Sequence, residues 1–426
     1  RMFSLSFERG RSLPRAECVG EGGAHVVFRV DELDGVVLRL PRDAGWWWWD
    51  ARVRVCLRFE REVAASALGR EFLPEPAAVR LDARIKAAIA AVRPGLGAWA
   101  TRVADVTRLW LPNDTSCTGP TLALEVKLKA ASGPRSWLVA PHNAELKARH
   151  SRLEIVRAAK GRLGYASHHE LWGGSFDDVR RAAGDLVGNA NEYQHLWRCF
   201  RDGQPTPDVP AYALDVLASV LCREPLRDRL RAAQRNDFLD VDGVAFLLDR
   251  HGDDVTVPTA PGPFPTSAET ACRAKDREFQ EATVETRRRR RREGQDALSR
   301  LSRQQAAEAL RRWLLALAMD DASVVVAFRS TAASEERCQS VSHAGICAWC
   351  CTGSGEDMLT GSVGGGSFAY TVAAIDIGPK PAAKLAAKAK AEDDLCFRAL
   401  EAFGEFSSSL SGPTTDDDDV SSSAAP

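Results

Sequence analysis

The residues of this chain best suited to chemistry are lysines, arginines and carboxylates that recur in a few short segments. One segment, LEVKLK at residues 124–129, alternates apolar and charged residues. In a β-strand successive side chains point to opposite faces, so Glu125, Lys127 and Lys129 would share one face while the apolar residues enter a core. In an isolated strand such a face is usually only solvated. Its function depends on whether other segments supply matching chemistry.

A glycine-rich loop, GEGG at residues 20–23, precedes an apolar segment that begins near Val26. Glycines allow backbone N–H groups to approach phosphate oxygens closely, so a hairpin with this tip can cover a nucleotide. Arg39, on the strand that follows, would direct a permanent positive charge to the same place. Most such clusters are only tight turns. The sequence contains no GxxxxGKS or GxxxxGKT motif, which excludes a Walker-type phosphate loop.

Two aspartates, Asp320 and Asp321, occupy the turn in LLALAMDDASVVVAF. The residues before them predict a buried helix that ends at Met319, and the β-branched residues after them predict an interior strand. Aspartates in such a turn are usually caps or turn formers. A carboxylate held at the mouth of a site can also accept a proton from a substrate hydroxyl. Both interpretations are open from this segment.

The segment VAAIDIGPKPAAKLAAKAKAEDD combines a carboxylate with a row of lysines. Its apolar strand ends at Asp376, and Pro381 stands where a helix can begin. Lys380, Lys384 and Lys388 recur every four residues and therefore share one side of that helix. A helix of this composition is ordinarily only a soluble one. Beside an aspartate, however, the pattern indicates Mg²⁺ on the carboxylate and phosphates on the lysines.

The elements that must position these residues predict an α+β protein. A glycine loop followed by two apolar strands and a polar turn, between residues 18 and 40, is typical of a β-hairpin. An amphipathic helix is expected from about residue 53 to 67, and TLALEVKLK returns to a strand pattern. The second half is predicted to be mostly helical, because FDDVRRAAGDLV and EYQHLWRCF place apolar residues at helical spacing.

The chain has 426 residues, 45% of them hydrophobic, and a formal net charge of -1. It can bury the core of two or three lobes, whereas a polyanion must be bound by a local cluster of charge. Arginines fill residues 287–292, but acids flank this run, so a solvated helix face is expected and a nucleic-acid partner is not. Eleven cysteines with few regular spacings indicate a reducing compartment, cytoplasmic or nuclear. No membrane segment is expected.

Five segments, taken in chain order, resemble the inositol-pentakisphosphate 2-kinase family. They are GEGGAHVVFRV with VVLRL, LEVKLK, ELWGGS, AMDDASVVV and AIDIGPKP, and they span about residues 18–395. The resemblance implies a two-lobed kinase that uses ATP and Mg²⁺ to phosphorylate the axial 2-hydroxyl of inositol pentakisphosphate. The product would be inositol hexakisphosphate. We expect this small molecule as the partner, no membrane, and a monomer.

The resemblance also implies roles for individual residues. Asp321 would be the catalytic aspartate, assisted by Lys127, and Asp376 would bind the metal ion. The remaining roles are ATP binding, by Gly20, Gly22, Gly23, Arg39, Asn113, Asp114 and Glu125, and inositol phosphate binding, by Arg102, Lys129, Arg157, His195, Lys380, Lys384 and Lys388.

The sequence departs from the family pattern at several substrate positions. The family has Arg and then an aromatic residue where this chain has Lys384 and Lys388. Its Gln-Asn-Asn aligns with residues 194–196, so His195 takes the place of an asparagine. A further substrate lysine has only Arg157 or Lys160 as a stand-in. These differences concern substrate selectivity more than phosphoryl transfer.

A structural zinc site is not expected. Plant members of the family carry one before the catalytic aspartate, but residues 241–272 lack the Cys-x-x-Cys that it requires. His343, Cys347, Cys350 and Cys351 have acceptable zinc spacing later in the chain, yet no convincing further partner. Free thiols in a loop are the simpler interpretation.

We therefore expect a two-lobed, kinase-like α+β fold. Residues 1–130 would form an N-terminal nucleotide-binding lobe with an antiparallel sheet, residues 131–405 a larger, mainly helical lobe with the substrate site, and residues 406–426 a disordered acidic and Ser-rich tail. The alternatives are a kinase with altered inositol phosphate specificity and a non-catalytic protein that binds inositol phosphates or nucleic acid. An ordinary protein kinase is disfavoured because neither HRD nor DFG occurs. Lys147, outside every matched segment, is expected to be a neutral control for mutagenesis.

Overall fold

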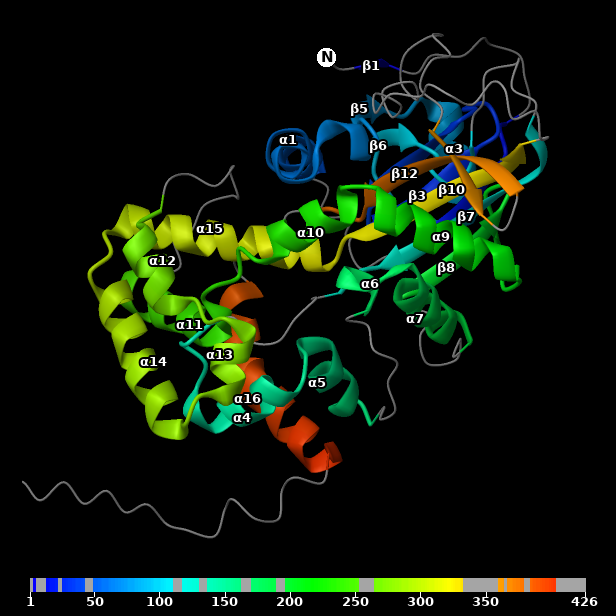
Figure 1. Cartoon of the computed structure of the whole chain (residues 1–426). Coiled ribbons are helices and arrows are strands. Elements are labelled where there is room, and N and C mark those ends of the chain that lie inside the picture. The colour runs from blue at the N-terminus through cyan, green and yellow to red at the C-terminus, as the bar shows by residue number, and fades with distance from the viewer. Residues whose placement is uncertain are drawn as a thin grey trace, which may run out of the picture.

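The computed structural model of the chain is built around two β-sheets with helices packed on them (Figure 1). This mixture of sheets and helices confirms the predicted α+β class. No helix in the described part of the chain combines the length and hydrophobicity needed to cross a bilayer. The structure describes residues 3–4, 13–21, 25–42, 49–109, 117–129, 136–161, 170–188, 196–252, 264–331, 359–363, 366–378 and 384–403.

The first sheet has the strand order β1-β5-β6-β4-β3-β2. β3 and β4 form the predicted antiparallel hairpin, and only β1 and β5 pair in parallel. One face of the sheet packs on α3 (Ala83–Val92) through Phe28, Leu38 and Ile85. The strands are β1 (Phe3–Ser4), β2 (Ala16–Glu21), β3 (His25–Val30), β4 (Val36–Pro41), β5 (Ala77–Arg80) and β6 (Trp99–Ala104).

The second sheet has the strand order β11-β12-β10-β7-β8-β9, with antiparallel neighbours. β7, which contains most of LEVKLK, therefore pairs with strands from the second half of the chain. How the chain divides into domains stays a prediction. The strands are β7 (Cys117–Lys127), β8 (Trp197–Arg201), β9 (Gln204–Thr206), β10 (Ser323–Thr331), β11 (Leu359–Val363) and β12 (Gly366–Ile375).

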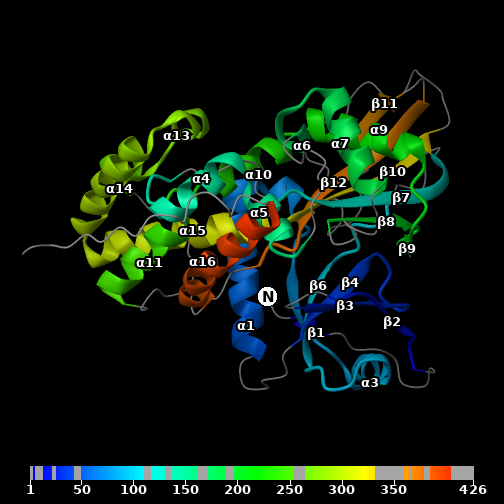
Figure 2. The same ribbon diagram turned by 90° about the horizontal axis from the view of Figure 1, so that it is seen from below.

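The largest core lies on one face of the second sheet. Leu124 and Val126 of β7 and Val326 of β10 pack there against α7 (Phe176–Gly188), α9 (Ala211–Arg223) and α10 (Leu226–Gln234). Each fully buried side chain of this size stabilises the fold by roughly 1.5–3 kcal/mol. α7 confirms the helix predicted over FDDVRRAAGDLV. Figure 2 shows the first sheet on the far side of the second sheet from α7 and α9.

The helix predicted over EYQHLWRCF is wrong where the structure describes this segment, because Trp197–Arg201 form β8. The apolar residues fit a helical or an extended period equally well over so short a run. Pairing with β7 decides the outcome: Trp197 lies opposite Val126, and Cys199 lies opposite Leu124. Tertiary contacts thus override the local pattern.

A continuous helical segment connects the two sheets. α1 (Trp49–Arg58), the π-helical η2 (Phe59–Ala64) and α2 (Ala65–Leu68) follow one another, which confirms the helix predicted near residues 53–67. α1 contacts β5 and β6 of the first sheet, whereas Phe59, Val63 and Leu68 belong to the core of the second sheet. The segment therefore holds the first sheet against the rest of the molecule.

Of the remaining helices, α4, α11, α12, α13 and α14 lie beyond the second sheet, at the other end of the molecule from α3 (Figure 1). α15 ends at Asp320 and leads into β10, as predicted for the segment with the two aspartates. α16 follows β12 and confirms the last predicted helix. The bounds are η3 (Arg70–Phe72), α4 (Pro141–Arg149), α5 (Arg152–Ala158), α6 (Glu170–Gly173), α11 (Asp240–His251), α12 (Thr266–Cys272), α13 (Asp276–Glu281), α14 (Val284–Ser299), α15 (Arg303–Asp320) and α16 (Lys384–Phe403).

Candidate functional site

LEVKLK lies at the centre of the second sheet, and its two faces differ as predicted. Its three apolar side chains are at most 3% exposed. On the other face Glu125 is also buried and only 4% exposed, whereas the side chains of Lys127 and Lys129 are 25% and 24% exposed. A buried acid beside two half-buried lysines costs desolvation energy. The charged face is therefore not a simple solvated one.

Two ion pairs bring together the three segments that carry lysines and carboxylates. Lys127 Nζ lies 3.4 Å from Asp376 Oδ2. Lys129 Nζ lies 2.5 Å from Asp321 Oδ1. Each lysine of LEVKLK therefore faces the acid of a different segment, and the four charges form one cluster at the end of the sheet.

The strand register explains why these side chains meet. Ser323 begins β10 and lies opposite both Lys127 of β7 and Ile375 of β12. Asp321 stands two residues before β10, and Asp376 directly follows β12. The same end of three neighbouring strands therefore carries both acids and both lysines. No single segment contains this information.

Side chains behind the cluster hold its backbone. Gln234 Nε2 of α10 donates to the carbonyl oxygens of Leu128, at 2.9 Å, and Met319, at 3.2 Å. Trp172 Nε1 of α6 donates to the carbonyl oxygen of Lys129 at 3.0 Å. These hydrogen bonds fix the chain on both sides of the Lys129 ion pair, as a preorganised site requires. Trp172 belongs to the matched segment ELWGGS, whereas nothing in the sequence marks Gln234.

The two acids of the cluster are exposed carboxylates, and one of them, Asp376, has a strained backbone conformation. Asp376 has a φ of 60°, in the left-handed region that residues other than glycine rarely adopt. Its side chain is 48% exposed, and that of Asp321, the C-terminal cap of α15, is 44% exposed. Strain of this kind concentrates at functional positions because the surroundings must impose it.

The first sheet contributes Arg39 to the face turned away from α3. Val27 lies opposite Arg39 on one side and Gly20 on the other, so the three residues share that face. Arg39 Nη1 lies 3.3 Å from Glu60 Oε1, and both side chains are largely buried. Glu60 belongs to η2, and π-helical turns are frequent at functional sites. The sequence analysis missed Glu60, because an amphipathic pattern does not reveal a π-turn.

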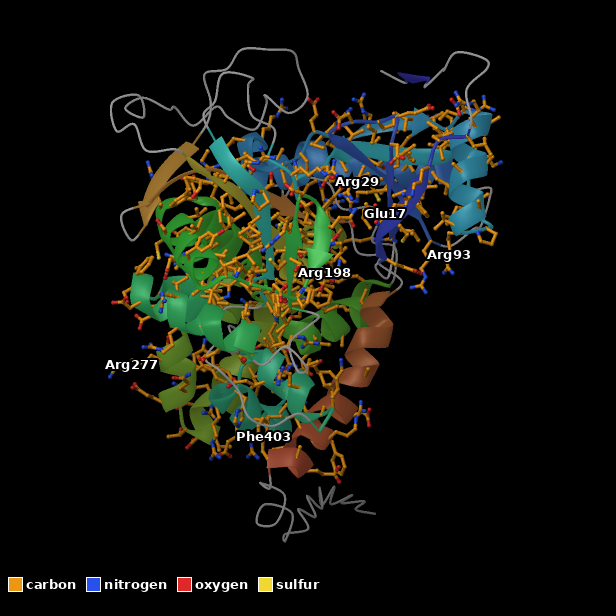
Figure 3. The ribbon with its side chains drawn as sticks, turned by 90° about the vertical axis from the view of Figure 1, so that its right-hand side faces the viewer. Glu17, Arg29, Arg93, Arg198, Arg277 and Phe403 are labelled. Atoms are coloured by element: carbon orange, nitrogen blue, oxygen red, sulfur yellow. The ribbon has the colours of Figure 1, made fainter. Side chains whose placement is uncertain are left out.

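Arg198 is another residue of the site that was not expected from the sequence. On β8 it lies directly opposite Glu125. A Cβ atom added to Gly20 would lie 3.8 Å from Arg198 Nη1, so the guanidinium reaches the glycine-rich segment. Figure 3 shows Arg198 below the first sheet, where Glu17 and Arg29 are labelled. The alternation in WRCFR was the available signal, but a helix was expected there.

The buried acids of the site have raised pKa values. Burial raises the pKa of Glu125, and the charge of Asp376 adds to this effect while Arg198 opposes it. Burial also raises the pKa of Glu60, where Arg39 opposes the shift and Asp376 again adds to it. Asp376 therefore repels both buried carboxylates, and a positive charge placed beside it would relieve the repulsion.

The acids of the site suit Mg²⁺ bound together with phosphates. Within the described residues, no group of three or more His, Cys, Asp or Glu side chains is arranged to hold a metal ion. Mg²⁺, however, is usually bound by one or two protein carboxylates plus substrate phosphates and water. Asp376 is exposed and repels the buried Glu125, so this pair fits such a role.

Other predicted site residues lie elsewhere or outside the described part of the chain. Arg102 is an exposed residue of β6, next to Arg39's strand. Arg157 is buried on α5, which packs against α16. For Lys384 and Lys388 the structure describes only the helical backbone of α16. The positions outside the described residues are Gly22, Gly23, Asn113, Asp114, His195, Lys380 and the cluster of His343, Cys347, Cys350 and Cys351.

The similarity of this chain to known proteins lies at the level of a family model. No curated protein matches the chain. A family model described as inositol-pentakisphosphate 2-kinase matches residues 19–394, which include every segment that contributes to the charged cluster. Because this match covers most of the 426 residues, the chain belongs to the inositol-pentakisphosphate 2-kinase family.

Proposed function

We propose that this protein transfers the γ-phosphoryl group of ATP to the 2-hydroxyl of inositol pentakisphosphate, giving inositol hexakisphosphate. Membership in the family supports a kinase. The observation that carries the proposal is the pair of contacts from Lys127 to Asp376 and from Lys129 to Asp321. These contacts bring together Asp376, which would bind the metal ion, Asp321, which would accept the proton, and two lysines that would bind phosphates.

The nucleotide would bind between the two sheets. Arg39 and Arg198 are cations on facing sides, next to Gly20 at the edge of the glycine-rich segment. Glu60 holds Arg39 through their ion pair and so orients its guanidinium. Asp376, with Glu125, would hold Mg²⁺. A bound Mg²⁺ neutralises the charge of the ATP phosphates.

The acceptor hydroxyl would bind at Asp321. Its carboxylate would accept the hydroxyl proton as the phosphoryl group arrives. A substrate with five phosphates and a nucleotide repel each other, and fixed cations must offset that repulsion. Lys127 and Lys129 are two residues apart on one face of the sheet, and each stands at one of the two acids. Positioning and charge neutralisation supply the catalysis.

Incubation of the protein with ATP, Mg²⁺ and a panel of inositol phosphates tests this function, with the products separated by charge. We expect one added phosphate on inositol pentakisphosphate and slower turnover of the other inositol phosphates. Faster phosphorylation of a different member of the panel than of inositol pentakisphosphate would show altered specificity. Binding of inositol phosphates without consumption of ATP would show a non-catalytic protein. Either result would overturn the proposal.

The variant Asp321→Asn tests the proton-accepting role. It keeps the shape of the side chain but removes the base, so turnover should fall at least a hundredfold, as expected for general-base catalysis. Binding of inositol pentakisphosphate, measured by calorimetry, should stay within a few fold of wild type. Near-normal turnover would contradict the assignment of Asp321.

A further inference from the structure

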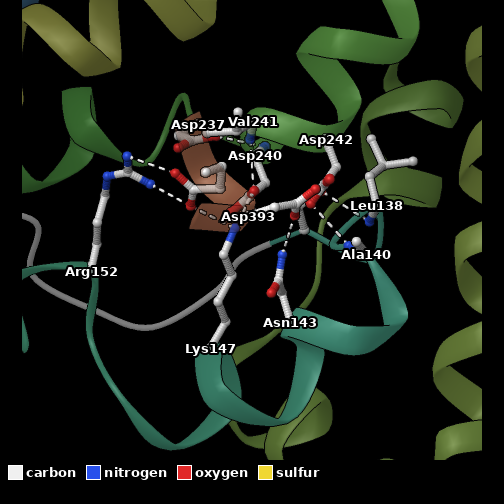
Figure 4. A network of polar contacts seen from close by, with 12 residues as sticks. Leu138, Ala140, Asn143, Lys147, Arg152, Asp237, Asp240, Val241, Asp242 and Asp393 are labelled. Carbon is white, nitrogen blue, oxygen red and sulfur yellow. Dashed lines mark hydrogen bonds and ion pairs between the residues drawn. The ribbon is translucent and has the colours of Figure 1, made fainter. Parts of the chain in front are cut away.

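A polar cluster outside the site, buried at Lys147 and Glu392 and exposed at Asp393, connects α16 to three other helices (Figure 4). We call it the α16 anchor. It consists of side chains from α4, α5, α11 and α16 that form ion pairs and hydrogen bonds with one another. Its members are Asn143, Lys147, Arg152, Asp240, Glu392 and Asp393.

Glu392 is the centre of the anchor. It is 3% exposed, and its two carboxylate oxygens accept from Arg152 at 2.8 and 3.0 Å. Lys147 Nζ lies 2.9 Å from the same carboxylate. A fork of two parallel hydrogen bonds from arginine has a narrow angular tolerance. The geometry therefore fixes Glu392 in rotation as well as in distance.

Lys147 links Glu392 to α11. Its ammonium lies 2.7 Å from Asp240 Oδ1, and its side chain is 5% exposed. Burial disfavours the charged form of Lys147, but the charges of Asp240 and Glu392 outweigh this effect and raise its pKa. Asp240 has a φ of 54°, a strained conformation for a residue other than glycine. Lys147 is therefore unsuited as the neutral control for mutagenesis, because its removal would leave the Asp240 carboxylate without its ion-pair partner and Glu392 with Arg152 alone.

The next residue of α16 is held separately. Asp393 Oδ1 accepts from Asn143 Nδ2 at 2.8 Å, and His142 Nε2 lies 3.0 Å from the same oxygen. Beside these polar contacts Leu146, Ile155 and Cys396 form a small apolar core between α4, α5 and α16. Apolar packing tolerates small slides and rotations, whereas paired buried charges do not. The polar contacts thus fix the position of α16 along its axis relative to α4 and α5, which apolar packing alone would not specify.

The anchor stands close to the lysines of the same helix. Glu392 lies four residues after Lys388 and eight after Lys384, in the continuous helix Lys384–Phe403. At ~1.5 Å per residue these separations are about 6 and 12 Å along the axis. Steps of four residues also keep the three positions on one side of the helix. A rotation or slide at Glu392 would therefore move both lysine positions with it.

We propose that the α16 anchor sets the register and rotation of α16, and that Lys147, Arg152 and Glu392 are positioning residues for the phosphate-binding lysines at its N-terminal end. This inference rests on the proposed function, in which Lys384 and Lys388 would bind phosphates of inositol pentakisphosphate as the family resemblance implies. The anchor contributes no group to the reaction. It determines where the row that begins at Lys384 and Lys388 stands relative to the end of β12 and Asp376.

The test compares Glu392→Gln with Asp394→Asn. Asp394 lies two residues further on the same helix, but it is exposed, and among the described residues it pairs along the helix with Arg398. Glu392→Gln should raise KM for inositol pentakisphosphate about tenfold, the loss expected from one charge-assisted contact, and leave KM for ATP within twofold. Asp394→Asn should change neither. An equal rise in both Michaelis constants, or no rise, would overturn the proposal.

A second variant separates positioning from stability. Lys147→Met combined with Asp240→Asn and Glu392→Leu removes the buried charge of Lys147 together with both acids that pair with it, which should restore the melting temperature. KM for inositol pentakisphosphate should nevertheless stay raised, because the register is lost. Recovery of both quantities would show that apolar packing suffices and would refute the anchor.

Amide hydrogen exchange makes the test independent of activity. In Glu392→Gln, exchange at residues 384–391 should accelerate about tenfold or more, while β7 and β10 keep wild-type rates. Unchanged exchange at residues 384–391 would refute the anchor. A folded wild-type protein that phosphorylates none of the inositol phosphates would overturn the proposed function alone, and these exchange rates would still decide the anchor.

Discussion

Each acid around the site has a particular cation beside it. Lys127 faces Asp376, Lys129 faces Asp321, and Arg39 faces Glu60. These pairs place the cations before any phosphate arrives, so little reorganisation is required on binding. When phosphates bind, they would share or replace the carboxylates as partners of the cations.

The two lysines of LEVKLK should have separable effects. Lys129→Ala should raise KM for the inositol phosphate, and Lys127→Ala should mainly lower turnover by loosening phosphate alignment. Each lost contact should cost about 1.5–3 kcal/mol, or tenfold to a hundredfold in kcat/KM. Lys86→Ala, an exposed position on α3, replaces Lys147 as the control and should match wild type. Wild-type kinetics for both strand variants would mean that the charged face is only solvated.

Glu125 should make folding stability depend on pH. Its folded pKa is raised above the ordinary value of 4.5, chiefly by burial. A raised pKa of an acid means that the protonated form favours the folded state, so stability is complete below the ordinary value and is lost as pH rises through the folded value. Glu125→Gln should therefore melt at a higher temperature than wild type at pH 8, although it impairs catalysis.

The control for Glu125→Gln is the comparison of its melting temperature with that of wild type at low pH. Near pH 4 the wild-type carboxyl is largely protonated, so the two melting temperatures should converge. The measurement is thermal unfolding without ATP or Mg²⁺ from pH 4 to 8. A difference that is constant across this range, or of opposite sign, would contradict the prediction.

At the scale of elements, α14 shows how a basic run can be structural. Three of its six arginines are exposed, as a solvated face predicts, but the other three are half-buried. Arg291 Nε donates to the carbonyl oxygen of Leu138 at 3.1 Å, and Arg287 donates to that of Phe279 at 3.1 and 3.2 Å. The inner arginines thus tie α14 to α13 and to the segment before α4.

Substitutions on the two sides of α14 should therefore differ. Arg291→Ala removes a charged donor from a carbonyl group and should lower the free energy of unfolding by roughly 1–3 kcal/mol. The double variant Arg288→Ala with Arg292→Ala, both exposed, should change it by less than about 0.5 kcal/mol. Chemical denaturation measures both. Equal losses on the two sides, or salt-dependent DNA binding abolished by the double variant, would contradict this account.

At the scale of the whole molecule, a buried junction joins the hairpins of the two sheets. Arg29 of β3 pairs with Asp105 at 2.8 Å and donates to the carbonyl oxygen of Gly203, in the β8–β9 turn, at 3.0 Å. Arg108 donates to the carbonyl oxygen of Asp202 at 3.1 Å. Because β8 also carries Arg198, this junction fixes the distance between the glycine-rich hairpin and the cation beneath it.

Gly203→Ala tests the junction. A Cβ atom there would stand 2.6 Å from atoms of Arg29 and Arg108, and the φ of +80° adds backbone strain. Gly252→Ala is the matched control, because its φ is +78° but nothing lies within 4 Å. The control should lose about 1–3 kcal/mol from strain, and Gly203→Ala should lose more and bind ATP more weakly. Equal losses with unchanged ATP affinity would mean that the junction does not position the nucleotide site.

Most of the local elements, and the two lysines and two aspartates of the charged cluster, follow from the sequence alone. The alternation of LEVKLK, the helix before Asp321 and the strand before Asp376 each follow from a period that the backbone imposes on short segments. The hairpin of β3 and β4 and the α+β class follow in the same way. The resemblance to the kinase family rested on these segments, and the family match confirms it.

Only the tertiary structure decided which charges meet. Strand register pairs residues that are far apart in the chain, and a local pattern contains no information about register. Pairing with β7 makes WRCFR the strand β8 and places Arg198 opposite Glu125. Packing of η2 brought Glu60 to Arg39, and packing of α4 against α16 buried Lys147, which its sequence context marks as an ordinary surface lysine. The energy of a buried charge depends on its partners, and only the folded chain supplies them.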